Sequence, residues 1–292
     1  MNNKPHVQPT QPVIIIGAAR SGTRLVRDTI AQHPDISFVP YDINFIWRLG
    51  NEKLPHDEIS PDSLDETKRE RIRRKFFAFN RDKPYLIEKT VSNCLRVPFV
   101  NTVIPEAKYI HLVRDGWDVI ESVHRQWTQR PDLRYILNKT LSYPLVDAPG
   151  YALSYAQSTF RKLISGDRQN AGTWGPRYRG IVEDLAARDT LEVCAIQWTV
   201  SVQKSYNDLS EIPSECIFEL SYQTFVREPQ IQLRKIASFL GLDPNLSIQY
   251  IDVKHITGDN IGRGKTSLSK EQKKLIAPYI KEADLLKLTF TN

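Results

Sequence analysis

A glycine-rich turn near the N-terminus has residue types that could bind an anion. The chain reads PVIIIG over residues 12–17 and AARSGTRL over residues 18–25. A strand that leads directly into such a turn and then into a helix presents backbone N–H groups, and the positive end of the helix, to a negatively charged group. The turn is therefore a candidate phosphate cradle, with the cation of Arg20 inside it.

The same turn differs from the loop GxxxxGK[ST] of nucleoside triphosphate-binding proteins at its last two positions. Gly17 and Gly22 have the required spacing. Thr23 and Arg24, however, stand where that loop has a lysine for the phosphates and a hydroxyl for magnesium. The sequence therefore disfavours a metal-dependent kinase or ATPase and predicts a site without a metal ion.

Five short runs of hydrophobic, mostly β-branched residues are typical of buried strands in a parallel sheet. They are residues 13–16, 36–39, 85–87, 109–113 and 216–220. Amphipathic stretches lie between them, and Val119, Val123 and Trp127, for example, fall on one side of a helix. This alternation predicts an α/β fold with a central parallel sheet flanked by helices, and the glycine-rich turn follows its first strand.

The C-terminal part of the sequence predicts two further helices. Ile231, Leu233, Ile236 and Leu240 indicate one helix that ends at Gly241. Ser269 together with Gln272 indicates the capped start of the last helix.

Two stretches fit the alternation poorly, and we interpret both as insertions around the site. The sequence thus predicts a single domain over residues 1–292, with insertions around residues 43–84 and 128–188. The first insertion contains the basic run KRERIRRK at residues 68–75. Such a run is most often a solvated helix face, and the alternative is a basic rim that captures an acidic acceptor.

The composition is that of an ordinary globular protein. The 292 residues are 40% hydrophobic and 25% charged, which excludes a disordered chain. A net charge of +6 suits an anionic ligand but is not a nucleic-acid-binding signature. Cys94, Cys194 and Cys216 lack CxxC spacing, which favours a reducing compartment over a zinc ribbon or a disulfide framework. No apolar stretch reaches the length of a membrane span, so we expect a cytoplasmic protein.

Four segments resemble motifs of the sulfotransferases that use 3′-phosphoadenosine 5′-phosphosulfate (PAPS). GAARSGTRLVRDTIAQHPDI, residues 17–36, resembles their 5′-phosphosulfate loop, most closely that of the tyrosylprotein and carbohydrate branches. VRDGWDVIES, residues 113–122, is similar to the 3′-phosphate motif, and EKTVSNCLRVPF, residues 88–99, to the substrate-side segment. LSYQTFVREPQIQLRKIASFLGL, residues 220–242, looks like the segment that closes the nucleotide site. The resemblance implies a P-loop-like domain.

The resemblance also implies an activity and a set of site residues. PAPS would be the co-substrate, no metal would be needed, and a sulfuryl group would pass to a hydroxyl, or less commonly an amine, of a glycan or metabolite. Arg20 would stabilise the leaving 5′-phosphate and Lys89 would neutralise the sulfuryl oxygens. Asp42, the acid nearest to the end of the second strand, would be the general base. The nucleotide-binding residues implied are Gly17, Arg20, Ser21, Gly22, Thr23, Arg24, Arg114, Ser122, Tyr222, Arg263, Gly264 and Lys265.

Each of these roles has a structural alternative. Arg20 could merely anchor its loop, and Lys89 could pair with Glu88 at the surface. Asp42 could cap a turn or a helix. Arg114 could pair with the aspartate one or four residues further on.

Two other functions remain open from the sequence. One is an atypical P-loop kinase, which would need ATP and magnesium. The other is an inactive homologue that binds a nucleotide or an anionic polymer without turnover. Among the histidines, His33 and His111 are interpreted as structural, whereas His124 could line the site.

Overall fold

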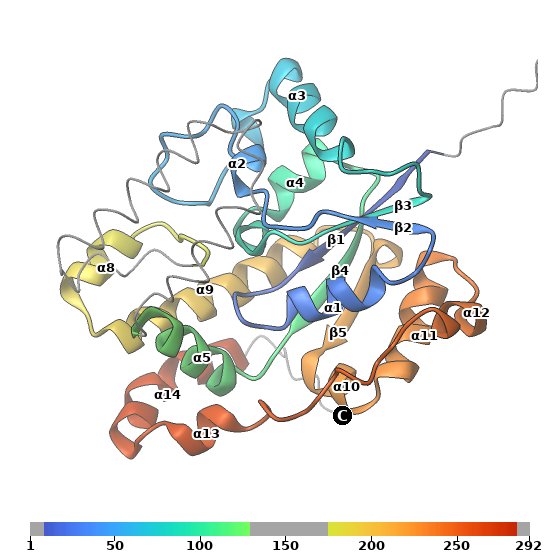
Figure 1. Ribbon diagram of the computed structural model, residues 1–292. Helices are drawn as coiled ribbons and strands as arrows, with labels where there is room; N and C mark the ends of the chain where they lie inside the picture. The colour runs from blue at the N-terminus through green and yellow to red at the C-terminus, as the bar shows by residue number, and fades with distance from the viewer. Residues whose placement is uncertain (1–8, 129–174, 285–292) are drawn as a thin grey trace, which may run out of the picture.

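Parallel strands form the centre of the protein in the computed structural model, which describes residues 9–128 and 175–284. Within those residues the sheet has five strands in the order β2-β3-β1-β4-β5 (Figure 1). Their bounds are Gln11–Ile16 for β1, Ile36–Phe38 for β2, Tyr85–Glu88 for β3, Lys108–Val113 for β4 and Ile217–Ser221 for β5. Every neighbouring pair is parallel. The predicted α/β fold is confirmed, with each strand within two residues of its expected bounds.

The central strand β1 explains why its sequence is an unbroken hydrophobic run. It pairs with β3 on one side and β4 on the other, with Val13 opposite both Ile87 and Lys108. Ile14 and Ile16 belong to one hydrophobic core, whereas Val13 and Ile15 belong to a second core on the other face. A strand with both faces covered has no exposed position for a polar residue.

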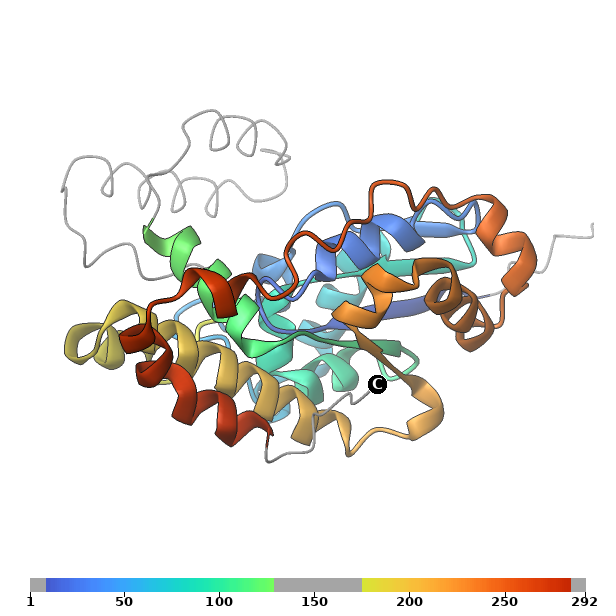
Figure 2. The ribbon, with the colours of Figure 1, turned by 90° about the horizontal axis from the view of Figure 1, so that it is seen from below.

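Helices cover both faces of the sheet, as Figures 1 and 2 show. One core includes residues of α1 (Thr23–Ile30), α10 (Tyr222–Arg227) and α11 (Pro229–Leu240), and α12 (Pro244–Gln249) follows α11. The other core includes residues of α2 (Asn44–Trp47), α3 (Glu66–Phe77), α4 (Val97–Val103), α5 (Gly116–Thr128), α8 (Ile181–Ala187), α9 (Thr190–Leu209) and α14 (Lys270–Asp284). Short helical turns lie at η1 (Pro61–Ser63), η2 (Val91–Leu95), η4 (Ser214–Cys216) and α13 (Arg263–Ser267).

Two helix ends have the residue patterns that the sequence predicts for them, whereas one residue expected to be buried is exposed. Gly241 ends α11 in a left-handed conformation with a φ of 86°, as expected of a C-terminal glycine. Ser269 and Gln272 form reciprocal hydrogen bonds at the start of α14. Ile231, expected on the buried face of α11, is instead 46% exposed, because the helical repeat places it on the side of α11 opposite Leu233 and Ile236.

The two predicted insertions have different outcomes. Residues 43–84 contain α2, η1 and α3 and connect β2 to β3, so this stretch is the crossover between two neighbouring parallel strands. Most of the second, residues 129–174, lies outside the described residues, and residues 175–188 form a loop and α8. The single-domain organisation stays a prediction. In the described part of the chain, no helix has the length and apolarity needed to span a bilayer.

Candidate active site

A predicted site residue follows the carboxyl end of each of the five strands. Taken along the chain from β1 to β5, these residues are Arg20, Asp42, Lys89, Arg114 and Tyr222. Because the strands are parallel, these ends lie along one edge of the sheet. Open α/β sheets bind their ligands at this edge. The topology therefore brings together residues that are up to 202 positions apart, counted from Arg20 to Tyr222.

The turn after β1 is packed tightly against its neighbours. Gly22 has a φ of 96°, and a Cβ atom there would lie 2.5 Å from the ring of Tyr222. A Cβ atom on Gly17 would lie 2.7 Å from the carbonyl oxygen of Leu112. Arg20 has a φ of 66°, a conformation that costs about 1–2 kcal/mol for a residue with a side chain. Close contacts therefore require both glycines of the predicted cradle, and backbone conformation requires a glycine at Gly22 as well.

Side chains of this turn have different surroundings. Ser21 and Thr23 are buried. Arg24 pairs with Asp28 on the outer surface of α1 at 3.2 Å, and its side chain is 76% exposed. The structure thus directs Arg24, a predicted nucleotide-binding residue, toward solvent.

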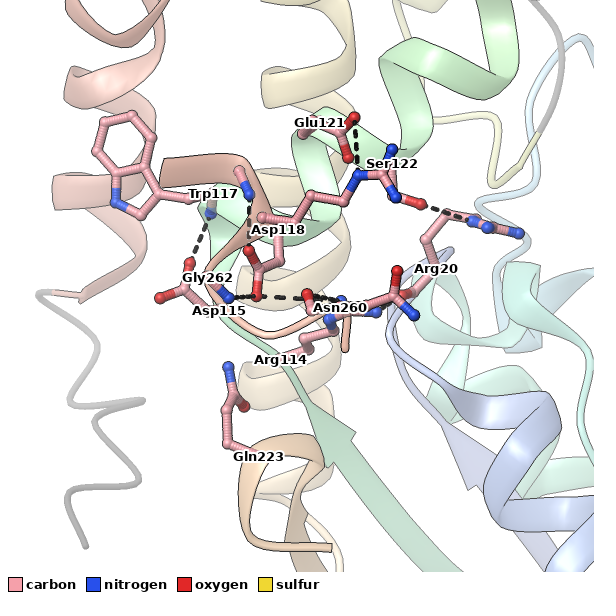
Figure 3. A network of polar contacts seen from close by, with 12 residues as sticks. Arg20, Arg114, Asp115, Trp117, Asp118, Glu121, Ser122, Gln223, Asn260 and Gly262 are labelled. Carbon is pink, nitrogen blue, oxygen red and sulfur yellow. Dashed lines mark hydrogen bonds and ion pairs between the residues drawn. The ribbon is translucent and has the colours of Figure 1, made fainter. Parts of the chain in front are cut away.

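Arg20 links the two turns that resemble phosphate-binding motifs. Its Nε donates a hydrogen bond to Oγ of Ser122 at 2.9 Å, although the two residues are 102 positions apart (Figure 3). Ser122 lies in α5 and is buried. The first and second motifs therefore share one site.

Arg114 connects this turn to a segment near the C-terminus. Its Nη1 donates to the carbonyl oxygen of Arg20 at 3.1 Å, and its Nη2 donates to that of Asn260 at 2.9 Å. The guanidinium stacks on the ring of Tyr222, 4.2 Å from its centroid. The predicted alternative, a pair with Asp118, is present at a longer distance of 3.9 Å. Nε of Arg114 is buried and has no hydrogen-bond partner among the described residues.

The predicted C-terminal residues reach the start of α5. Lys265 pairs with Asp115 at 3.1 Å, and Arg263 lies 3.8 Å from Glu121. Gly264 packs directly on the α5 backbone. These contacts place both cations beside the motif that resembles the 3′-phosphate site.

Lys89 and Asp42 form an ion pair on the other side of the site. Their Nζ and Oδ1 atoms lie 2.5 Å apart, and the side chains are 11% and 34% exposed. The alternative pair of Lys89 with Glu88 does not form, because Glu88 is fully buried and its Oε2 accepts a hydrogen bond from Asn93 at 3.2 Å. Burial raises the pKa of Glu88 to about 7. Asp42 does not cap α2 either, since the residue at its N-cap is Ile43.

A buried aspartate that the sequence analysis missed stabilises the loops on this side. Asp57 is 1% exposed and accepts hydrogen bonds from Arg48, Ser92 and the backbone N–H of Arg177. Burial alone would raise the pKa of Asp57, but the charge of Arg96 and these hydrogen bonds outweigh it and lower the pKa. Asp57 thereby joins the loop after α2 to the segment before α8. It lies outside every periodic segment, so no sequence signal marked it.

His33 and His111 have structural surroundings, as the sequence predicts for both. Nδ1 of His33 accepts a hydrogen bond from the backbone N–H of Asp35 at 3.1 Å, so His33 stabilises the turn after α1. His111 lies inside β4, and burial lowers its pKa to about 4. His124 on α5 is partly exposed, and burial lowers its pKa as well.

Acidic residues pair with cations of the basic run at residues 68–75. Arg69 pairs with Glu66, and Arg73 pairs with Glu106, so two arginines of the run have partners on its own helix or on the neighbouring loop. This pairing favours the solvated helix face.

Across residues 9–128 and 175–284, no three His, Cys, Asp or Glu side chains gather as a metal site.

Comparisons with known proteins find sulfotransferases. Residues 12–142 match the sequence model of the "Sulfotransferase family". A protein of Caenorhabditis briggsae, named as a candidate protein-tyrosine sulfotransferase, is 20% identical over 242 residues, which cover 80% of this chain. This chain spans only 66% of that relative's length.

Solved structures of sulfotransferases share the fold. A sulfotransferase from Mycobacterium avium superposes with a TM-score of 0.52 at 13% identity, over 95% of this chain and 79% of that one. The sulfotransferase domain from the curacin biosynthetic pathway gives a TM-score of 0.51 at 17% identity, over 92% and 97%. The matches confirm the relationship predicted from the motifs: this chain is related to the sulfotransferases, transferase enzymes that share its fold and, over residues 12–142, its sequence pattern.

Proposed function

We propose that the protein transfers a sulfuryl group from PAPS to a hydroxyl group of an acceptor. The observation that carries this proposal is the contact of Arg20 with Ser122, which joins the two motifs resembling phosphate-binding turns. PAPS carries anionic groups at both its 5′ and 3′ positions. A donor with two anionic ends needs two such turns in one site, whereas a nucleoside triphosphate needs one.

The surroundings of Arg114 support binding of an anion at this place. Its Nε is a buried donor without a partner among the described residues, and a buried polar atom of this kind is costly unless a ligand or water satisfies it. Arg263 and Lys265 approach from the C-terminal segment. Charge-assisted hydrogen bonds from such cations are strong and directional, which suits a phosphate dianion.

The proposed chemistry assigns one task to each of three side chains. PAPS, when bound, supplies an activated sulfuryl group. Asp42 accepts the proton of the acceptor hydroxyl as the new oxygen–sulfur bond forms, and Lys89 neutralises the sulfuryl oxygens. Arg20 stabilises the negative charge on the 5′-phosphate as the old sulfur–oxygen bond breaks and adenosine 3′,5′-bisphosphate leaves.

The ion pair of Lys89 and Asp42 is consistent with these tasks. Both charged groups are partly buried and balance each other before substrates bind. The sulfuryl group and the acceptor hydroxyl would then separate the pair, each meeting the charge that it needs. Their positions after β3 and β2 put them next to Arg20 along the sheet edge, because β3 lies between β2 and β1.

The proposal extends to the class of acceptor. We infer a hydroxyl of a glycan or other metabolite, with an amine as a less common acceptor. An acidic glycan would use the cations of the run at residues 68–75 that have no pairing partner of opposite charge on α3, such as Arg74. The cytoplasmic location predicted from the scattered cysteines belongs to the same proposal.

A binding titration tests the donor. Adenosine 3′,5′-bisphosphate should bind without any metal, and more tightly than ATP with magnesium. Preferential binding of ATP with magnesium would contradict the proposal in favour of an atypical kinase.

An acceptor screen tests the transfer itself. Labelled PAPS is incubated with panels of neutral glycans, acidic glycans and small hydroxylated metabolites, and transfer of label to one panel is expected. Tight binding of the bisphosphate with no transfer to any acceptor would favour the inactive homologue.

A further inference from the structure

The segment of residues 260–265, here named the strap, lies against the first two turns of α5. Asp118 in α5 is 2% exposed and faces the strap (Figure 3). Its Oδ2 accepts a hydrogen bond from the backbone N–H of Gly262, and its Oδ1 accepts one from the backbone N–H of Gly264, both at 2.9 Å. A single buried carboxylate thus holds two backbone groups that are 144 and 146 positions away in the chain.

The strap fits this place only because its backbone touches the backbone of α5. A Cβ atom on Gly264 would lie 2.0 Å from the carbonyl oxygen of Trp117 and 2.7 Å from the backbone nitrogen of Asp118. Gly262 has a φ of 76°, which starts α13 from a left-handed conformation. A side chain at residue 264 would therefore move the strap away from α5.

The position of the strap determines where its two cations lie. Arg263 and Lys265 flank Gly264, and their side chains are 45% and 60% exposed, near acidic residues in and just before α5. The carbonyl oxygen of Asn260 accepts the hydrogen bond from Arg114 described above. Asp118 also pairs with Arg114 at 3.9 Å, on the side of the site that resembles the 3′-phosphate motif.

The charge of Asp118 gives these hydrogen bonds their strength. A carboxylate that accepts two backbone N–H groups forms charge-assisted bonds, which are about twice as strong as neutral ones. The positive N-terminal end of α5 further stabilises a negative charge in its first turn. An amide in place of the carboxylate keeps the shape but turns an N–H group toward one of the two donors.

We propose that Asp118 is a positioning residue for the nucleotide, which seats the strap so that Arg263 and Lys265 reach the 3′-phosphate. This inference rests on the proposed PAPS-dependent function and adds a residue to it. Asp118 acts through the strap and touches no reacting atom. Its loss therefore reduces recognition of the 3′-phosphate and leaves the 5′ side of the site intact.

The test compares two ligands that differ only in the 3′-phosphate. Dissociation constants for adenosine 3′,5′-bisphosphate and adenosine 5′-monophosphate are measured by calorimetry for the wild type, Asp118→Asn and Gly264→Ala. Gly264→Ala displaces the strap without touching the carboxylate, so it provides a second variant should Asp118→Asn fold poorly. We expect the bisphosphate to bind at least about tenfold more weakly to both variants, and the monophosphate to change by less than about twofold.

Asp243→Asn is the matched control. Asp243 lies before α12 and also accepts two backbone hydrogen bonds, from Asn245 and Leu246, at 2.8 and 3.0 Å. This variant makes the same chemical change at a helix start that has no contact with the strap. It should leave both dissociation constants unchanged.

Steady-state kinetics separate positioning from general damage to the fold. In Asp118→Asn the KM for PAPS should rise about tenfold or more, with kcat at saturating PAPS within about threefold of the wild type. Unchanged discrimination between the two ligands in both variants would overturn the role of Asp118, as would equal losses for both ligands. A wild-type protein that does not discriminate between the ligands would instead remove the proposed function, and this inference with it.

Discussion

At the scale of single residues, the proposed chemistry depends on charged side chains that hydrogen bonds within the protein hold in place. Arg20 bonds to Ser122, and Lys89 bonds to Asp42. Such preorganised groups need little rearrangement when charge develops on a substrate. Glu88 lies next to Lys89 in the chain but faces the core, and burial raises the pKa of Glu88 to about 7.

Removal of a charge-stabilising side chain should affect turnover far more than folding. Arg20→Ala and Lys89→Ala should each lower kcat by about 100- to 1,000-fold, the usual loss for one preorganised donor. Turnover is measured with saturating PAPS, together with thermal unfolding. Arg69→Ala, which removes an exposed cation paired with Glu66 on α3, is the control and should retain wild-type turnover. Near-normal turnover of Lys89→Ala would show that Lys89 has no catalytic role.

Glu88 should make the protein less stable as the pH rises. Its pKa is about 7 in the folded protein, against 4.5 for an exposed glutamate, so between these values the folded state binds more protons than the unfolded state. The free energy of unfolding should therefore fall with increasing pH over this range, by on the order of 2–3 kcal/mol from this group.

Urea unfolding of the wild type and Glu88→Gln at pH 5 and pH 7.5 measures this contribution as a difference. The comparison is needed because His111, with a lowered pKa of about 4, contributes a slope of the opposite sign up to its ordinary value of 6.5. Glu88→Gln should gain stability relative to the wild type at the higher pH. An equal difference at both pH values would mean that Glu88 does not titrate in this range.

At the scale of elements, the site is built where turns approach one another closely. The turn after β1 leaves no room for a side chain at Gly22, because the ring of Tyr222 from α10 lies there. The same ring stacks on the guanidinium of Arg114 from the end of β4. The segments that follow β1, β4 and β5 thus pack together around the ring of Tyr222.

Gly22→Ala should disrupt this arrangement. The new methyl group would collide with Tyr222 at 2.5 Å and would also force a side chain into a φ of 96°. We expect binding of adenosine 3′,5′-bisphosphate to weaken by at least about tenfold, measured by calorimetry.

Gly180→Ala separates the two causes. Gly180 has a φ of 97°, but nothing lies within 4 Å of its Cβ position. The Gly180→Ala substitution should therefore lower the free energy of unfolding by the backbone strain alone, about 1–2 kcal/mol. It should leave binding of adenosine 3′,5′-bisphosphate unchanged. Equal binding by the wild type and Gly22→Ala would show that the turn does not approach the nucleotide.

At the scale of the whole molecule, the parallel sheet places both halves of the proposed reaction on one edge. The donor side lies after β1, β4 and β5, and the acceptor side lies after β2 and β3. The loop around Asp57 and the segment at Arg177 are joined on the acceptor side. We expect the proposed sulfuryl transfer to need no metal in this arrangement, because arginine and lysine side chains would carry the positive charge.

Full activity in the presence of EDTA is therefore expected. Thr23 occupies the position of the triphosphate loop's lysine and is buried, while Arg24 points to solvent, so neither can serve a nucleotide-bound magnesium ion. Turnover is compared after dialysis against EDTA and after addition of magnesium. An absolute requirement for magnesium would contradict the proposed function and favour the kinase.

Local sequence determined the elements and the type of site. Hydrophobic runs located the five strands that the structure describes, because a strand buried on both faces needs an unbroken apolar segment. Residue patterns at helix ends located Gly241 and Ser269, since capping depends on neighbours within a few positions. The glycine-rich turn after the first strand indicated anion binding for the same reason: its backbone geometry depends on its own residues.

The partners of the charged side chains were decided only by the tertiary structure. From the sequence, Lys89 had an acidic neighbour in Glu88, yet it pairs with Asp42, 47 positions away. Alternation along β3 turns Glu88 into the core, and the sheet order brings the end of β2 beside Lys89. The hydrogen bonds of Asp118 to the strap span 144 and 146 positions. Such contacts follow from the packing of whole elements, which no short-range pattern in the sequence encodes.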